Sequence, residues 1–403
     1  MNILFLHPNF PAQFKSPCLE LAKYTHHIKF ICQTHYGRSI SGVEKLVLKG
    51  RGSHENTLLS SQNEHNRTLF RGKIYRESFL ILKDAGWNPD VAIAHSGWGC
   101  GIHIKEIWPK THFISYLEWW FDAESDLVDK LSKSKYFDFS INSSSKLLIR
   151  NMPAAYEMCV ADQIIAPTEW QKNQLPRLLR ENCQVVQDQI DSNIFFPEPE
   201  KISEFPVLTY GTRGMEPMRG FPQFIQILPQ LLQKWPQLTV EIAGTDTVSY
   251  GGKLPKEKSW KKWALNFLNQ EGIANRVKWL GTMPLAEYAN WLKKTWCHVY
   301  FSEPYVTSWS LIEALHCQIP MVISDNKLID EFSQLSANII RADHNNKAEV
   351  VEAISKKIRF AAISTPAMGN TAKAMQTKSV VFAKTHATTL ASLIADVEAT
   401  TKV

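Results

Sequence analysis

The chain has 403 residues, which is enough for two domains that each bury a core of their own. Its apolar content of 44% and charged content of 21% are typical of a globular protein. The formal net charge of +6 is spread along the chain, and we interpret it as a solubility charge, with attraction to anionic lipid or phosphate-bearing substrates as the weaker alternative. No Lys/Arg block is dense enough to indicate nucleic acid as a partner, and no window reaches the roughly eighteen apolar residues of a membrane span.

The cysteines and histidines argue against two kinds of site. The seven cysteines are odd in number, scattered and without a C-x-x-C pair, which favours reduced thiols in a cytoplasmic protein over a disulfide framework or a zinc site. The thirteen histidines show no metal-ligand spacing. The first apolar run, Asn2–Leu6, is too short for a signal peptide. We therefore expect a cytoplasmic protein that binds no metal.

Strands and helices alternate in the first half of the chain. Residues 2–6 are continuously apolar, as in a parallel strand covered on both faces, and a helix is predicted over about 16–24. The loop between them reads HPNFPAQF and lacks the glycines of a dinucleotide-binding G-x-G-x-x-G turn. Residues 37–66 are polar and irregular, and we interpret them as a loop-rich segment.

Two further strands in this half end on polar residues. Residues 90–95 are predicted as a strand that ends at His95 before a glycine-rich turn, and residues 112–117 as a strand followed by Glu118 among aromatic residues. Ligands of open α/β sheets collect at such strand ends. For His95 we favour a functional role over a histidine bonded only to backbone. Glu118 is equally well interpreted as a carboxylate that acts on or binds an acceptor hydroxyl and as a helix cap.

A linker is predicted at about 198–205, which gives domains of residues 1–197 and 205–377. The second domain opens with a strand and a loop that carries Arg213 and Arg219 between flanking glycines. Two guanidinium groups at a strand-to-helix loop can clamp a diphosphate and stabilise the charge on a leaving group. We prefer this interpretation to two solvated loop arginines. The last helix, at about 378–403, is predicted to pack back on the first domain.

Residues 299–325 are predicted as strand, loop, helix and strand. Thr307 or Ser308 can cap a helix that runs to about residue 317, and a helix N-terminus suits a phosphate or diphosphate. Glu313 lies in the second turn of that helix. From there its carboxylate can accept hydrogen bonds from a ribose diol while the helix start holds the phosphates.

The same stretch resembles the donor-sugar signature of the bacterial family 4 glycosyltransferases. Its second half fits, with Glu313-Ala314, Ile319-Pro320 and Ser324-Asp325. Its first half departs, because Tyr305 stands where the family has its first glutamate and residues 306–308 replace Gly-Phe-Gly. Glu303, ten residues before Glu313, can replace that glutamate only through a different loop. The HPNFPAQF loop and the PDVAIAHSGWG string resemble a subgroup whose chains begin with HxNFPxQF.

The resemblance implies an α/β protein of the GT-B fold, with two doubly wound, Rossmann-like domains facing a central cleft. The first domain is then the acceptor side and the second binds the nucleotide sugar. The residues with implied catalytic roles are His95, Arg213, Arg219 and Glu118. His95 would face the donor sugar, and Arg219 stands in place of the family's lysine. Donor-binding roles fall to Glu313, Gly281, Thr282, Met283, Tyr305, Thr307, Ser308, Trp309 and Ser310.

The function that follows is a retaining glycosyltransferase. It moves a hexosyl group from a nucleoside diphosphate sugar to a glycan or lipid-linked acceptor in cell-surface polysaccharide synthesis. No D-x-D occurs, so we expect neither an essential metal nor a cofactor beyond the sugar nucleotide as co-substrate. We expect a cytoplasmic location at the inner face of the membrane, with a weak peripheral contact to it. One alternative is a non-hydrolysing nucleotide-sugar epimerase. The other is a non-catalytic nucleotide-sugar-binding subunit, which stays open because Tyr305 stands where the family has a glutamate.

Overall fold

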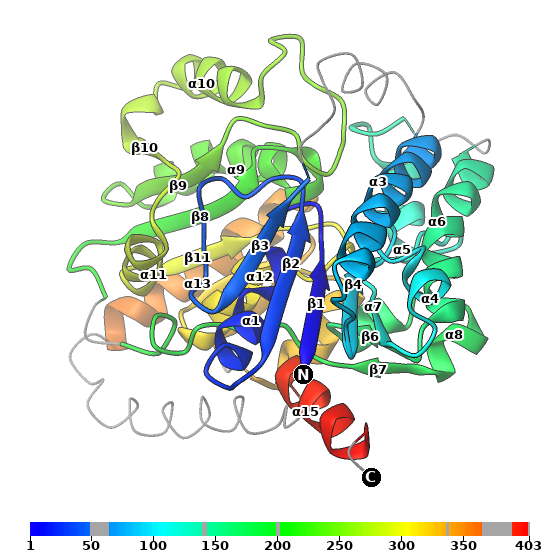
Figure 1. Ribbon diagram of the computed structural model, residues 1–403. Coiled ribbons are helices and arrows are strands. Elements are labelled where there is room, and N and C mark those ends of the chain that lie inside the picture. The colour runs from blue at the N-terminus through cyan, green and yellow to red at the C-terminus, as the bar shows by residue number, and fades with distance from the viewer. Residues whose placement is uncertain (49–63, 139–142, 199–201, 336–337, 365–388, 402–403) are drawn as a thin grey trace. The chain divides into compact units, whose positions relative to one another are not determined.

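The computed structural model describes residues 1–48, 64–138, 143–198, 202–335, 338–364 and 389–401 (Figure 1). The chain forms two compact units. The first comprises Met1–Ser125, Ile141–Gln189 and His386–Val403, and the second comprises Asp126–Ser140 and Ile190–Thr385. Each unit is built on a parallel sheet with helices, so the predicted α/β class is confirmed.

The first unit contains a seven-stranded sheet in the order β3-β2-β1-β4-β5-β6-β7, with every pair parallel. Its strands are β1 (Asn2–Leu6), β2 (His27–Cys32), β3 (Val43–Val47), β4 (Val91–His95), β5 (His112–Tyr116), β6 (Gln163–Ala166) and β7 (Cys183–Val185). Its helices are η1 (Ala12–Phe14), α1 (Lys15–Leu21), α3 (Glu64–Asp84), α4 (Ile104–Ile107), α6 (Ser143–Val160), α7 (Glu169–Lys172), α8 (Arg177–Glu181) and α15 (Leu390–Thr401).

Helices cover both faces of this sheet, as the apolar run of β1 requires. Alternate residues of a strand point to opposite faces. Ile3 and Phe5 join a core with α1 and α15, whereas Leu4 and Leu6 join a second core with α3 and α4. Ile394 of α15 is fully buried in the first of these cores. The start of the last helix predicted near residue 378 lies outside the described residues.

The second unit contains a six-stranded parallel sheet in the order β10-β9-β8-β11-β12-β13. Its strands are β8 (Val207–Gly214), β9 (Thr239–Thr245), β10 (Val277–Gly281), β11 (Cys297–Tyr300), β12 (Met321–Ser324) and β13 (Ile339–Ala342). Its helices are α5 (Asp126–Lys133), η3 (Pro217–Arg219), α9 (Phe221–Lys234), α10 (Trp260–Gln270), η4 (Ala274–Arg276), α11 (Leu285–Lys293), α12 (Trp309–His316), η5 (Lys327–Leu335) and α13 (Lys347–Ser364).

The segment Asp126–Ser140 belongs to the second unit, although the sequence places it inside the first domain, 1–197. The Tyr136 ring packs edge-on against Trp260 at 5.7 Å, and the Tyr136 carbonyl accepts a hydrogen bond of 2.7 Å from the Lys253 N–H. These contacts join residues more than a hundred positions apart. Local sequence periodicity does not encode such contacts, so the sequence did not reveal that Asp126–Ser140 belongs to the second unit.

The loop-rich interpretation of residues 37–66 is wrong in part. Val43–Val47 form β3, which pairs in parallel with β2 at the edge of the sheet, and α3 begins at Glu64. Charged residues interrupt the apolar pattern of β3, as is common on an edge strand. Residues 49–63 lie outside the described part of the chain. In the part that is described, no helix combines the length and apolarity needed to cross a membrane.

We expect Gly220→Ala to destabilise the second unit more than Gly272→Ala. Both glycines have positive φ, +62° and +69°, so an alanine at either position costs about 1 kcal/mol of backbone strain. A Cβ at Gly220 would also overlap Phe301, whereas nothing lies within 4 Å at Gly272. Overpacking of this kind adds about 1–3 kcal/mol. Chemical unfolding of the two variants measures the difference, and equal midpoints would contradict it.

Candidate active site

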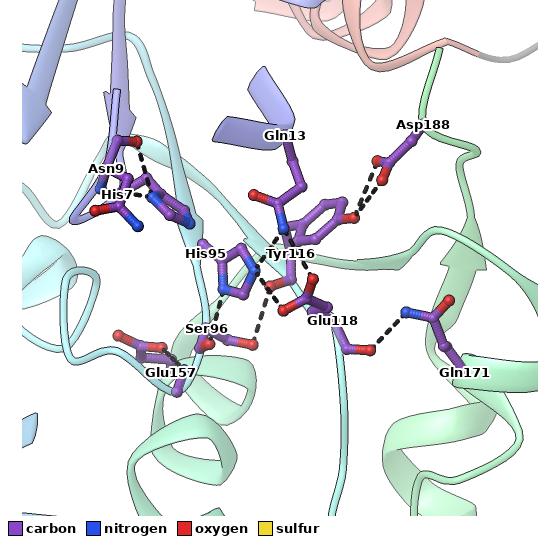
Figure 2. Close-up of polar contacts among 11 residues, drawn as sticks. His7, Asn9, Gln13, His95, Ser96, Tyr116, Glu118, Glu157, Gln171 and Asp188 are labelled. Atoms are coloured by element: carbon purple, nitrogen blue, oxygen red, sulfur yellow. Dashed lines mark hydrogen bonds and ion pairs between the residues drawn. The ribbon is translucent and has the colours of Figure 1, made fainter. Parts of the chain in front are cut away.

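Polar side chains gather at the carboxyl edge of the first sheet. β4 pairs with β1 on one side and with β5 on the other, so the residues that follow these strands lie together. His7 follows β1, His95 ends β4, and Glu118 comes two residues after β5. Figure 2 shows His95 between His7 and Glu118, with Gln13 of η1 reaching over it. Two of the predicted residues, His95 and Glu118, are thus brought together.

One side-chain amide links the two predicted residues. The Gln13 Nε2 group lies 3.3 Å from His95 Nε2 and donates a hydrogen bond of 3.0 Å to Glu118 Oε1. The other carboxylate oxygen, Glu118 Oε2, is 3.5 Å from His95 Nε2. His95 is 2% exposed, whereas the Glu118 side chain is 37% exposed. Of these two residues, Glu118 is therefore the one that a ligand can reach.

These contacts define the tautomer of neutral His95. Its Nδ1 is 3.1 Å from the Ser96 carbonyl oxygen, which can only accept, so Nδ1 carries the proton. Nε2 then has a lone pair, which accepts from one N–H of Gln13 while the other N–H of that amide serves Glu118. His95 Nε2 is thus oriented as a hydrogen-bond acceptor, 3.5 Å from the carboxylate of Glu118.

The Glu118 backbone is held as well. Gln171 Nε2 donates to the Glu118 carbonyl oxygen at 2.6 Å. The next helix after Glu118 is α5, which begins only at Asp126, so Glu118 does not cap a helix. Of the two interpretations of this carboxylate, the structure supports the one in which it takes part in a polar site.

His7 forms the other flank of His95. The two rings meet edge to face with centroids 4.9 Å apart, and His7 Nδ1 accepts a hydrogen bond of 2.8 Å from the Asn9 N–H. Burial lowers the pKa of His7 well below its usual value, and the nearby His95 and Arg71 lower it further. His7 is therefore neutral at physiological pH.

A buried carboxylate holds the turn that follows β4. Glu157 of α6 is fully buried and accepts hydrogen bonds from the N–H groups of Gly97 and Gly101 at 3.0 and 2.8 Å. Burial raises the pKa of Glu157 to about 7, and the two backbone hydrogen bonds oppose that rise. A Cβ at Gly101 would lie 2.7 Å from the Phe113 ring, so this turn needs a glycine there.

The two predicted arginines of the second unit lie in different surroundings. Arg213 is exposed near the end of β8, whereas Arg219 is 6% exposed at the end of η3, just before α9. Arg219 Nη1 donates to Ser302 Oγ at 2.8 Å and to the Tyr300 hydroxyl at 3.4 Å, and its guanidinium lies 4.7 Å from the Tyr250 ring centroid. No carboxylate of the described residues forms an ion pair with Arg219.

The loop that carries Tyr250 is held by a second buried glutamate. Glu216, fully buried, accepts from the N–H groups of Ser249, Tyr250 and Gly251 at 2.9, 2.8 and 3.2 Å. The Tyr305 ring meets Tyr250 edge to face at 5.8 Å. Tyr305, predicted to bind the donor, and Arg219, predicted to be catalytic, therefore share Tyr250 as a neighbour.

Ser308 caps α12, in agreement with one of the two predicted caps. Its Oγ accepts from the Leu311 N–H at 3.3 Å, donates to the Tyr300 hydroxyl at 2.8 Å and lies 2.9 Å from Ser310 Oγ. Trp309 begins the helix and is 40% exposed, and Thr307 precedes the cap. The N-terminus of α12 and the Arg219 guanidinium therefore converge on the hydroxyl of Tyr300.

Glu313 is a partly buried carboxyl in the second turn of α12. Burial raises its pKa to about 7, and its carboxyl oxygens have no hydrogen-bond partner among the described residues. The other predicted donor residues form the turn after β10, where Gly281 has φ +68° with open space around it, Thr282 is exposed and Met283 is partly buried. Within the described ranges, no group of three or more His, Cys, Asp or Glu side chains is arranged to hold a metal ion.

Glu303 is 4% exposed, and its Oε1 lies 3.2 Å from Nε2 of the buried His344. Its backbone N–H donates to the Met218 carbonyl. Oε1 thus has an interior partner, whereas Oε2 is buried without a hydrogen-bond partner among the described residues. That Glu303 replaces the family's first glutamate stays a prediction.

Several residues of these networks received no role from the sequence. His7 and Gln13 stand in the HPNFPAQF string, whose resemblance to the HxNFPxQF subgroup was a usable signal. Glu157 and Glu216 had no signal, because each lies within an ordinary helical or loop context and acts on backbone groups more than thirty residues away.

Two family descriptions match the chain. Residues 24–195 match the Glycosyl transferase family 4 group, and residues 193–374 match Glycosyl transferases group 1. Together with the two parallel-sheet units and their polar carboxyl edges, these matches define a glycosyltransferase of the GT-B fold. The chain belongs to family 4 of these enzymes. Membership of the HxNFPxQF subgroup stays a prediction.

Solved structures share this fold at low sequence identity. Sucrose-phosphate synthase from Thermosynechococcus elongatus has a TM-score of 0.66 at 12% identity, over 96% of this chain and 98% of that one. WaaG, a glycosyltransferase involved in lipopolysaccharide biosynthesis, has a TM-score of 0.56 at 12% identity, over 96% and 99%. HepE from Anabaena, in complex with UDP and glucose, has a TM-score of 0.58 at 15% identity, over 95% and 99%. None of the curated protein sequences matches this chain.

We expect Glu157 to make stability depend on pH. Its pKa is about 7 in the folded chain against an ordinary 4.5, so between these values the folded state binds more protons than the unfolded state, and stability falls as the pH rises. The loss amounts to about 1–3 kcal/mol. Glu157→Gln cannot ionise and removes this part of the dependence. Thermal unfolding of both proteins between pH 5 and 8 should show wild type losing stability relative to the variant, with exposed Glu181→Gln as the control. A constant difference would contradict the prediction.

Proposed function

We propose that this chain is a retaining hexosyltransferase that uses a nucleoside diphosphate sugar and a glycan or lipid-linked acceptor in cell-surface polysaccharide synthesis. The observation that carries the proposal is Arg219. A buried guanidinium without a carboxylate partner is costly, and an anionic ligand would offset that cost. WaaG, described as involved in lipopolysaccharide biosynthesis, supports the choice of pathway.

On the donor side, the sugar nucleotide would bind around Arg219 and α12. The guanidinium and the N-terminal N–H groups of α12 would stabilise the negative charge that grows on the diphosphate as the glycosidic bond breaks. The unpartnered carboxyl of Glu313, one turn further along, would accept from the ribose hydroxyls. The turn at Gly281 would offer backbone groups to the base.

On the acceptor side, a hydroxyl would approach the exposed carboxylate of Glu118. Glu118 and His95 Nε2 are the two proton acceptors there, and Gln13 holds both in position. Bond formation between the acceptor oxygen and the anomeric carbon releases the acceptor proton, which this pair or the departing phosphate can take. We propose that the anomeric configuration of the donor sugar is retained, and the NMR spectrum of the product shows which anomer has formed.

We also propose that the reaction needs neither a metal nor a cofactor beyond the sugar nucleotide. Arg219, Arg213 and the start of α12 supply the positive charge that a divalent cation supplies elsewhere. Saturating EDTA should then leave donor binding and transfer unchanged.

The donor site is tested by thermal shift against UDP, GDP, ADP and dTDP sugars at pH 8, where Glu313 is ionised. UDP-glucose comes first, because HepE is described with UDP and glucose. A ligand at a hundred times its Kd should add about 2.7 kcal/mol to the stability of wild type. We expect no such gain in Arg219→Ala and a reduced gain in Glu313→Gln. Exposed Arg359→Ala on α13 serves as the control.

Stabilisation of Arg219→Ala equal to that of wild type would contradict the diphosphate site. So would the absence of any gain in wild type with all four nucleotide sugars. Transfer to acceptor rather than epimerisation of the free donor, read from the products, separates the proposed activity from the epimerase alternative.

We further propose a cytoplasmic location with a weak contact to the inner face of the membrane through α6. Four exposed apolar side chains, the α6 patch, follow one stripe of this helix: Leu148, Ile149, Met152 and Tyr156. Exposed Lys146 and Arg150 lie on the same turns, and an apolar stripe with basic neighbours suits an anionic lipid surface.

Vesicle sedimentation tests this contact. Met152→Glu should lower binding to vesicles that contain anionic lipid several-fold, because a carboxylate is placed in the apolar stripe. Leu178→Glu, at an exposed leucine of α8, is the matched control and should bind as wild type does. Equal binding of all three proteins would count against the α6 patch.

A further inference from the structure

An arginine beside the candidate acceptor site is held in one orientation. Arg71 of α3 donates from Nε to Gln33 Oε1 at 2.9 Å and from Nη1 to the Trp98 carbonyl oxygen at 3.1 Å. Its guanidinium lies over the Trp98 ring, 5.3 Å from the ring centroid. Two hydrogen bonds and one ring thus fix a side chain that is otherwise among the most flexible.

The charge of this arginine is not balanced by its neighbours. Among the described residues no carboxylate forms an ion pair with Arg71, and its Nη2 group donates to none of them. The titratable groups on which its charge acts are His7, Tyr75 and Cys100, and none of them is a carboxylate. An oriented guanidinium with one unused edge is suited to a phosphate or a carboxylate.

An exposed aromatic surface adjoins the guanidinium. Trp98 is 39% exposed, and its ring centroid lies 6.4 Å from that of His7 and 6.3 Å from that of His95. Exposed indole rings offer an apolar face on which a sugar can stack. The turn that carries Trp98 is fixed by Glu157 through Gly97 and Gly101, so the ring is held in position.

The site is therefore polarised across His95. Figure 2 shows His7 on one side of His95 and Glu118 on the other. Arg71 acts electrostatically on His7, and the Trp98 ring beneath it lies about equally far from His7 and His95, whereas the carboxylate of Glu118 would repel an anion on its own side. A ligand with an anionic group at one end and a hydroxyl at the other matches this arrangement in only one direction.

We infer that the first unit binds a sugar that bears an anionic substituent, a phosphate or a carboxylate, with the anion on Arg71, the sugar ring on Trp98 and a hydroxyl toward His95 and Glu118. That this sugar is the acceptor rests on the proposed function. The binding itself does not, because all the residues belong to one unit and no donor is required.

The test is ¹⁹F NMR of the full chain labelled with 5-fluorotryptophan, without donor. Trp98→Phe assigns the Trp98 signal among the thirteen tryptophans. The probes are glucose 6-phosphate, glucuronate, glucose and inorganic phosphate, at constant ionic strength because salt screens such contacts. We expect a saturable shift of the Trp98 signal with at least one anionic sugar, at an affinity about tenfold or more above that for glucose. The tighter of the two anionic sugars identifies the substituent.

Arginine variants separate binding from a structural role. In Arg71→Met the anionic and neutral sugars should bind equally weakly, and Arg71→Lys should keep part of the preference because the charge remains. Arg76→Met, five residues along α3 at an exposed arginine paired with Glu106, should bind as wild type does. If Arg71→Met fails to fold, wild type and Arg71→Lys still measure the preference.

Three results would overturn the inference: equal affinity of wild type for glucose and both anionic sugars, an unchanged preference in Arg71→Met, or inorganic phosphate binding as tightly as glucose 6-phosphate. Each would leave the donor site untouched, since that site is measured separately through Arg219. Conversely, loss of nucleotide-sugar binding would not alter the expected ¹⁹F shifts.

Discussion

Both units depend on a buried glutamate that accepts hydrogen bonds from the backbone of a distant turn. Glu157 binds the N–H groups of Gly97 and Gly101, and Glu216 binds those of Ser249, Tyr250 and Gly251. A carboxylate can accept several N–H groups at once, which few other side chains can do. Without it, each turn would leave backbone donors unpaired beside a core, at a cost of about 1–3 kcal/mol per group.

Each of these turns carries an aromatic ring, and an arginine packs on each ring. Arg71 lies over Trp98 in the first unit, and Arg219 lies over Tyr250 in the second. The ring shields one face of the guanidinium from water and leaves its edge for hydrogen bonds. The same arrangement thus occurs twice at strand ends, and in both units the positive charge has no described carboxylate as its partner. The proposed donor diphosphate and the proposed anionic sugar would each meet one of these two arginines.

The strands and their polar ends could be predicted from the sequence because they depend on local patterns. The apolar runs at Asn2–Leu6 and Met321–Ser324 are strands, and Ser308 caps α12 as expected. His95 and Glu118 could be anticipated because residues after neighbouring parallel strands share one edge of a sheet.

The rest of the site depends on contacts that no local pattern encodes. Gln13 joins His95 to Glu118 across 82 and 105 positions of the chain, and its own surroundings show only a loop. The strand Val43–Val47 was missed because its charged residues hide the alternation of an edge strand. Arg71 carries no motif at all. It becomes significant only when the fold places it over Trp98.

Because Asp126–Ser140 belongs to the second unit, it affects how the two units can be exchanged between related enzymes. The main chain passes from one unit to the other four times, so no single junction separates the first unit from the second. A chimera joined only near residue 190 would supply Tyr136 from one parent and its packing partner Trp260 from the other. A functional exchange of the second unit must therefore carry this fifteen-residue insert with it, as a non-contiguous graft.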